Sequence, residues 1–353
     1  MHDIRKLSAK VFLLSLLTVS TSLSSAQQPS DSTPPPPPPP EVQNRILIPA
    51  ISDSDVLRVE TDLVDTLFTA IDKDRRFVTD LTQEDIRISE NGVEQQISLF
   101  ERETDRPLTL VILVDTSKSQ EVTLPQEKRA ASAFIKAVVN PEKDRAAIVS
   151  FTGKPKIEQG LTNQISNLLT AIDKLEVVFP PDNAGCEEYR PVQEDSRCWT
   201  SIWDSVWATS AELLGQTRAG NRRAIILITD GDDTSSTIKQ EDAIAEAVKN
   251  NTVIYGIGVA GKDYPFDKKA IRKISERTGG RAFIPKDDTE LNATFTQIQQ
   301  ELRSQYVVAY TPKNRVRDGS FRQVQIEVVN PALKKRKLSL LYRKGYYAGK
   351  VGR

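Results

Sequence analysis

The sequence predicts an α/β protein with a doubly wound, mainly parallel sheet, flanked by a small β-sandwich that the N-terminal and C-terminal segments build together. Apolar runs of strand length alternate with stretches of helical period in the middle of the chain, and polar-apolar alternation marks both ends. At roughly 100–200 residues per domain, 353 residues favour two or three units. With 38% hydrophobic and 27% charged residues, the chain is expected to be mostly globular.

The middle of the chain, residues 104–303, predicts the parallel sheet. Uninterrupted apolar strands separated by amphipathic helices are typical of a parallel sheet that is covered on both faces. In that architecture, ligands bind at the carboxyl ends of the strands. The predicted strands span 108–114, 146–151, 224–228 and 253–259, and the clearest helical patterns span 127–139 and 202–214.

The two end segments, 51–103 and 304–350, each carry strand patterns that are too short to bury a sheet of their own. We therefore expect them to pair into one β-sandwich. In the first segment Asn91-Gly92 predicts a hairpin turn, because both residues tolerate positive φ. The strand before this turn is expected to contain Ile86 and Ile88, and the return strand Ile97 and Leu99; in the second segment Val324, Ile326 and Val328 alternate with polar residues.

The first 26 residues are expected to be a cleaved secretory signal peptide. Basic residues precede an apolar stretch at 11–19, and small residues follow at 24–26. The apolar stretch is shorter than the ~20 residues needed to span a bilayer, so membrane contact is expected only if this segment stays uncleaved. A Pro-rich linker at 27–50 follows, with seven consecutive prolines that favour an extended spacer. The protein is expected to be secreted, periplasmic or located in the cell envelope.

Composition excludes several classes of function. Lys+Arg and Asp+Glu are balanced at 48 each, which gives no bulk electrostatic reason to bind nucleic acid. The single histidine, His2, lies in the expected signal peptide, which excludes a histidine base and histidine-ligated zinc from the mature protein. Cys186 and Cys198 allow one disulfide or two free thiols, and export favours the disulfide.

Oxygen-bearing side chains follow two of the predicted strands. The strand 108–114 runs into Asp115-Thr116-Ser117-Lys118-Ser119, and the strand 224–228 runs into Thr229-Asp230-Gly231. Both carboxylates are therefore expected at one edge of the sheet, beside the hydroxyls of the first motif. Hard divalent cations prefer such oxygen donors. We expect Mg²⁺, with Mn²⁺ or Ca²⁺ left open.

The Asp-x-Ser-x-Ser motif and the later Thr-Asp-Gly resemble the metal-ion-dependent adhesion site of von Willebrand factor type A domains. The stretch from Thr200 to Asp204 resembles the family's Thr-Ala-Leu-x-Asp helix start. The resemblance covers roughly residues 105–303. It implies that Ser117, Ser119 and Thr200 are metal ligands, while Asp115 and Asp230 hold coordinated waters and supply charge. The chain departs from the family at Cys198-Trp199, where glycines usually precede the threonine.

The segments that flank this region extend the resemblance. The stretches at 318–322 and 343–347 resemble a group of secreted bacterial proteins related to von Willebrand factor A.

The resemblance implies a non-enzymatic module in which the metal accepts an exposed Asp or Glu of a partner protein. A metal-stabilised structural module of the cell envelope is the alternative. A Mg²⁺-dependent hydrolase is disfavoured, because the sequence contains no Gly-x-x-x-x-Gly-Lys-Ser/Thr loop and the mature chain is expected to contain no histidine.

The stretch 179–199 is long, irregular and net acidic, and it directly precedes Thr200. Three interpretations stay open. The loop can shape specificity for a partner, one of its carboxylates can mask the metal, or the loop can be solvated and do neither.

Overall fold

The computed structural model describes residues 63–102, 106–179, 199–218, 220–259, 261 and 266–349. All of them belong to one unit that runs from Val59 to Arg353. The expected signal peptide at 1–26, the Pro-rich linker at 27–50 and both cysteines lie outside the described residues, as does most of the acidic stretch 179–199.

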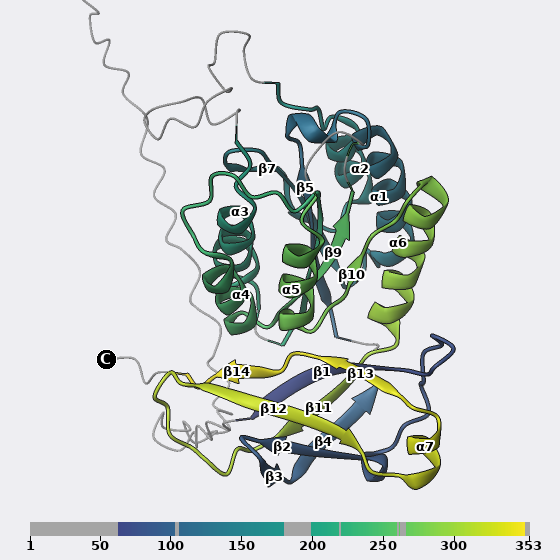
Figure 1. Cartoon of the computed structure of the whole chain (residues 1–353), viewed down its shortest axis with the longest axis vertical. Coiled ribbons are helices and arrows are strands. Elements are labelled where there is room, and N and C mark those ends of the chain that lie inside the picture. The colour runs from purple at the N-terminus through teal and green to yellow at the C-terminus, as the bar shows by residue number, and fades with distance from the viewer. Residues whose placement is uncertain are drawn as a thin grey trace, which may run out of the picture. The chain divides into compact units, whose positions relative to one another are not determined.

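A six-stranded, mainly parallel sheet occupies the middle of the chain, as the sequence predicts (Figure 1). Its strand order is β10-β9-β8-β5-β6-β7, and only β7 runs antiparallel. Starting from the central strand β5, the chain first adds β6 and β7 along one edge. It then adds β8, β9 and β10 along the other edge. The strands are β5 (Leu108–Asp115), β6 (Arg145–Phe151), β7 (Pro155–Thr162), β8 (Arg222–Thr229), β9 (Thr252–Gly258) and β10 (Ala282–Phe283).

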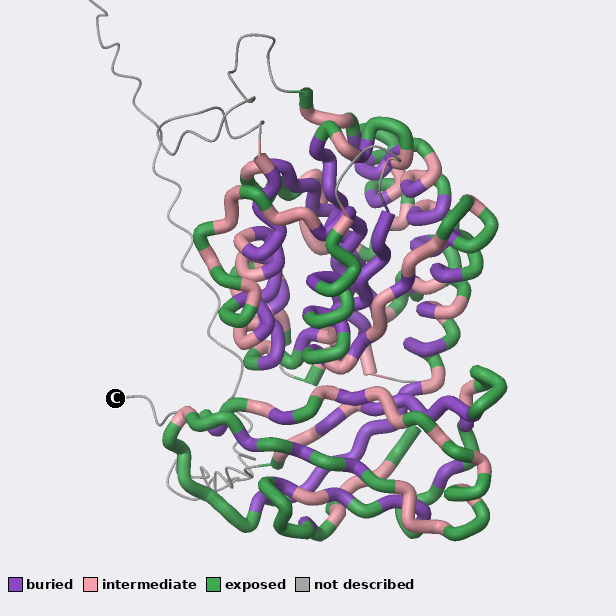
Figure 2. The backbone as a smooth tube through the Cα atoms, viewed as in Figure 1, coloured by how far each residue is buried: buried purple, intermediate pink, exposed green. Residues whose placement is uncertain are grey.

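Helices cover both faces of this sheet (Figure 1). All eight residues of β5 are buried, because alternate side chains pack against the helices on opposite faces (Figure 2). One face carries α1 (Leu124–Val138), α2 (Ile165–Asp173) and α6 (Asp288–Arg303). The other carries α3 (Ile202–Ala208), which continues as the π-helix η4 (Thr209–Leu214), together with α4 (Gln240–Lys249) and α5 (Lys268–Thr278).

Two four-stranded antiparallel sheets form the sandwich from both ends of the described chain, again as predicted. One has the order β13-β1-β11-β4, in which C-terminal and N-terminal strands alternate, and the other has the order β14-β12-β2-β3, in which β12 joins the C-terminal pair to the N-terminal pair. The strands are β1 (Val64–Ile71), β2 (Ile86–Glu90), β3 (Val93–Gln95), β4 (Ile97–Arg102), β11 (Tyr306–Tyr310), β12 (Phe321–Val328), β13 (Ser339–Tyr342) and β14 (Gly345–Tyr347).

Three short helical segments complete the described elements. They are η1 (Gln83–Asp85), η2 (Lys118–Gln120) and α7 (Pro331–Lys335). Across the described ranges, none of the helices combines the length and apolar character that a membrane crossing requires.

The hairpin at Asn91-Gly92 forms, but its predicted return strand is wrong. Both turn residues have positive φ, 48° and 81°, and the strand that returns is β3, with Val93 opposite Glu90. Ile97 and Leu99 instead belong to β4, which pairs with β11 in the other sheet. Val93, Ile97 and Leu99 keep the same alternating positions on both sides of Gln95 and Gln96, so their spacing does not reveal where the chain changes sheets.

Buried and exposed residues alternate along β12, so substitutions in this strand can test the sandwich core. Ile326 is 5% exposed and packs among residues from both ends of the chain. Ile326→Ala is expected to lower the free energy of unfolding by about 2–5 kcal/mol, because it removes buried methylenes and leaves a cavity. Gln323→Ala, on the exposed face of the same strand, should change it by less than about 0.5 kcal/mol. Urea unfolding followed by circular dichroism measures both, and equal effects would contradict the assigned core.

Candidate metal centre

The candidate site lies at the carboxyl ends of β5 and β8. These strands are parallel neighbours, with Val114 opposite Ile228, so Asp115 and Asp230 leave the sheet side by side. The chain leaves β5 toward β6 on one side and leaves β8 toward β9 on the other. The two aspartates therefore stand at the topological switch point, where ligands bind in open α/β sheets.

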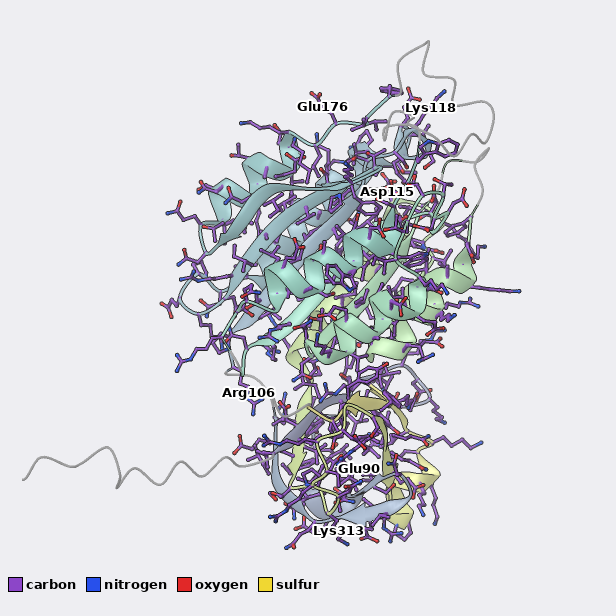
Figure 3. All side chains as sticks on the ribbon, turned by 90° about the vertical axis from the view of Figure 1, so that its left-hand side faces the viewer. Glu90, Arg106, Asp115, Lys118, Glu176 and Lys313 are labelled. Carbon is purple, nitrogen blue, oxygen red and sulfur yellow. The ribbon has the colours of Figure 1, made fainter. Side chains whose placement is uncertain are left out.

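The Asp-x-Ser-x-Ser motif folds back on itself directly after β5. The Ser117 backbone N–H donates to Asp115 Oδ1 at 3.0 Å, and the hydroxyl oxygens of Ser117 and Ser119 are 3.0 Å apart. Asp115 is fully buried and Ser117 is 7% exposed, whereas Lys118 is exposed at the surface (Figure 3). The structure thus brings three of the five predicted site residues together within one turn of chain.

Asp230 joins this group through side chains that sequence analysis did not single out. The Gln120 side-chain amide donates to Asp230 Oδ2 at 3.2 Å and lies 3.4 Å from the Ser119 hydroxyl. The Thr229 hydroxyl donates to Asp115 Oδ2 at 2.7 Å. Asp115 is therefore held by the last residue of β8, and Asp230 by a residue of the segment that follows β5.

Gly231 lets the chain turn just past Asp230. Its φ is 83°, and an added Cβ would lie 2.6 Å from the Asp267 carbonyl oxygen. A residue with a side chain would meet both the strain of positive φ and this close backbone contact.

The loop after Asp230 also holds the segment that carries Thr200. The Thr200 N–H donates to the Thr234 hydroxyl at 2.7 Å, and Asp233 accepts from the N–H of Ile202 at 2.7 Å, which caps the start of α3. Among the described residues, Thr200 makes no hydrogen bond to the other four predicted site residues.

An indirect path places Thr200 at the same edge of the sheet. The Ser201 backbone N–H donates to the Thr152 carbonyl oxygen at 2.8 Å, and the Thr152 hydroxyl lies 3.1 Å from that of Thr116, which stands between Asp115 and Ser117. Thr200 thus lies at the same edge of the sheet as the other predicted site residues but forms no hydrogen bond with them in the described structure.

The electrostatics of the site favour a cation. Burial raises the pKa of Asp115 to about 7, and repulsion from Asp230 adds to the shift, whereas hydrogen bonds from Ser117 and Thr229 oppose it. Burial also raises the pKa of Asp230. In the part of the chain that the structure describes, no Lys or Arg forms an ion pair with either aspartate. Within the described ranges, two buried carboxylates therefore stand together without a basic side chain paired to them.

The donor set fits a hard divalent cation. Asp115, Asp230, Ser117 and Ser119 supply only oxygen atoms, which Mg²⁺ and similar ions prefer. The described residues contain no group of three or more His, Cys, Asp or Glu that could hold an ion by themselves. A bound cation would thus depend on the serine hydroxyls and on water, and such a shell leaves room for an incoming ligand.

Sequence reasoning missed the residues that link these donors. Thr229 stands inside the Thr-Asp-Gly motif, and Gln120 follows the last serine of Asp-x-Ser-x-Ser. Both are fully buried. Their polar side chains directly beside the motifs are a usable signal, but which carboxylate each one contacts depends on the pairing of β5 with β8.

Comparison with known proteins gives matches over the same region. Two models of the von Willebrand factor type A domain match residues 110–232 and 204–299. No curated protein matches the sequence.

Solved structures with a similar fold include three low-identity examples. BatB from Bacteroides thetaiotaomicron is 15% identical, with a TM-score of 0.43, over 56% of this chain and 100% of its own. A von Willebrand factor type A protein from Catenulispora acidiphila is 14% identical, with a TM-score of 0.47, over 76% and 73%. Proximal thread matrix protein 1 from the mussel byssus, solved with a zinc-occupied MIDAS motif, is 17% identical, with a TM-score of 0.46, over 61% and 50%.

The two domain models together span residues 110–299, just over half of the chain, and they include all but the first two residues of β5, the whole of β8 and both aspartates. The chain therefore belongs to the family of von Willebrand factor type A domain proteins.

Proposed function

We propose that this protein is an exported, divalent-metal-dependent protein-binding module whose metal accepts an acidic side chain of a partner protein. One observation carries the proposal. Asp115 and Asp230 are buried side by side beside two serine hydroxyls, and no basic side chain of the described chain pairs with them. A structural site would be expected to satisfy its charges internally.

The residues would have different roles in such a site. Ser117 and Ser119 would hold the cation, with Thr200 as a further oxygen donor on a separate loop, and the aspartates would supply negative charge. When bound, the cation supplies positive charge and a coordination position that a partner carboxylate can fill. Lys118, exposed beside the serines, adds attraction for an acidic partner.

The rest of the proposal follows from sequence. Residues 1–26 would direct export, and the proline run would hold the domain away from its attachment point. We propose Mg²⁺ as the physiological cation and no catalytic activity, since the mature chain would contain no histidine base.

The first prediction concerns the metal. Ser117→Ala is expected to weaken Mg²⁺ binding by about tenfold or more, because it removes an oxygen donor, while leaving the melting temperature in EDTA close to that of the wild type. Isothermal titration of the chelator-stripped full chain measures the affinity. Ser166→Ala, an exposed serine in α2, is the control and should bind as the wild type does. Unfolding of Ser117→Ala in EDTA would support a purely structural site instead.

The second prediction concerns the partner. Peptides that differ only in a central Asp, Glu, Asn or Gln can be presented as arrays to the full chain. Retention is expected on Asp and Glu peptides in Mg²⁺, and it should be lost in EDTA and in Ser117→Ala. Equal retention of acidic and amide peptides, or retention that chelation does not change, would contradict the proposed mode of binding.

The third prediction concerns pH. The folded metal-free protein keeps Asp115 protonated up to about pH 7, whereas the unfolded chain loses this proton near pH 4. The free energy of unfolding in EDTA should therefore fall as pH rises from about 4 to 7. Saturating Mg²⁺ should remove most of this fall, since the cation takes the place of the proton.

Two comparisons isolate the contribution of the site. Asp115→Asn should reduce the pH dependence in EDTA, because the amide does not titrate in this range. Glu301, which pairs with Arg281, contributes equally with and without Mg²⁺, so the difference between the two curves reports the carboxyls that sense the metal site. Parallel curves in EDTA and in Mg²⁺ would contradict the assignment.

A further inference from the structure

Three glutamates are buried in the described part of the chain, and one of them differs from the others. Glu90 accepts hydrogen bonds from two tyrosine hydroxyls and pairs with Arg322, and Glu301 pairs with Arg281 at 3.4 Å. Glu127, in the first turn of α1, is 1% exposed, yet neither of its carboxyl oxygens has a hydrogen-bond partner.

A buried carboxyl without a partner is costly for the folded protein. The neighbours of Glu127 on the same face of α1 are Leu124, Ala130 and Ala131, which pack into the core. An apolar residue at this position would avoid the cost. Packing alone therefore gives no reason for a glutamate here.

Glu127 stands directly behind the candidate metal centre. Its backbone N–H donates to the Thr123 carbonyl oxygen at 3.1 Å, and the Thr123 hydroxyl donates to Gln120 Oε1 at 2.8 Å. The amide of the same Gln120 side chain holds Asp230 Oδ2 at 3.2 Å. A continuous polar path thus runs from Asp230 through Gln120 and Thr123 to the turn that carries Glu127.

We propose that Glu127 is a positioning residue of the metal centre, a third acidic side chain that becomes negatively charged when the divalent cation binds and so raises the affinity for it from behind the two aspartates. This inference rests on the proposed metal-dependent function. Glu127 is not a ligand, since the described residues bring no three carboxylates close enough to hold an ion directly. It would act through Gln120 and Thr123, which link Asp230 to the helical turn that carries Glu127.

The electrostatic surroundings agree with this role. Burial raises the pKa of Glu127 to about 8; the nearby Thr123 hydroxyl opposes the shift, and the negative charges of Asp115 and Asp230 add to it. The three carboxyls therefore act on one another electrostatically, and no basic side chain of the described residues forms an ion pair with them. A cation at the aspartates would relieve the repulsion at all three.

Glu127→Gln in the full chain tests the inference, because it keeps the size and polarity of the side chain and removes only its ability to ionise. Isothermal titration of the chelator-stripped protein with Mg²⁺ is expected to show affinity reduced by about 10–100-fold, the usual effect of losing a residue behind a metal site. The melting temperature in EDTA should be equal to or higher than that of the wild type, and the increase caused by Mg²⁺ should be smaller.

Glu301→Gln is the matched control. It removes another buried glutamate on the same face of the sheet, close to Arg222 at the opposite end of β8. This variant should keep the Mg²⁺ affinity of the wild type and lose stability equally with and without the cation, because Glu301 has a basic partner in Arg281.

The outcomes separate the two proposals. Wild-type affinity in Glu127→Gln, with binding lost in Ser117→Ala, would overturn the role of Glu127 and leave the metal site intact. A melting temperature lowered equally in EDTA and in Mg²⁺, with unchanged affinity, would assign Glu127 to packing and also overturn it. Failure of the wild type to bind Mg²⁺, Mn²⁺ or Ca²⁺ would overturn the proposed function and this inference together.

Discussion

Two carboxylates buried side by side at the ends of neighbouring parallel strands are the constraint on which the site depends. Asp115 and Asp230 cannot both be ionised in this position without a compensating charge, because burial strengthens their repulsion. Hydrogen bonds from Thr229 and Gln120 reduce the cost but carry no full positive charge. A bound positive charge, either a proton or a cation, would therefore stabilise this pair of carboxylates.

Elsewhere in the fold, a buried carboxylate is compensated by a basic side chain of the protein itself. In the sandwich, Glu90 of β2 pairs with Arg322 of β12 at 3.3 Å, and the side chains of both are 2% exposed. Tyr310 and Tyr346 donate to the same glutamate, so three C-terminal side chains hold one N-terminal carboxylate. That cluster joins the two ends of the described chain. It also shows that this protein compensates a buried acid where the role is structural.

Sequence patterns predict the strands well, because their burial follows directly from apolar runs. The run at 108–114 became β5, and the run at 224–228 lies within β8. The pattern failed at Ile97, since an apolar residue two positions beyond a hairpin strand fits either sheet. Only its pairing with Tyr310, more than two hundred residues later, decides between them.

The site was predictable to the extent that its residues follow strand ends in sequence. The proximity of Asp115 to Asp230 follows from two parallel strands being adjacent, and a doubly wound sheet, which the apolar runs predict, favours that adjacency. Gln120, Thr229 and Glu127 could not be assigned in this way, because their roles depend on contacts across loops and behind a helix. Local patterns report burial, whereas these contacts depend on tertiary packing.

The same hydrogen bonds connect the site to the segments around it. Asp230 is tied through Gln120 to the turn before α1, and the loop that follows Asp230 holds Thr200 and caps α3 through Asp233. A cation bound at Asp230 would therefore compete with the Gln120 amide for this carboxylate. The first connection runs through the Asp230 side chain, and the second runs through Asp233 and Thr234 in the loop that follows it. Both connections start at the end of β8, so the segments that lead into α1 and α3 are anchored at the same edge of the sheet.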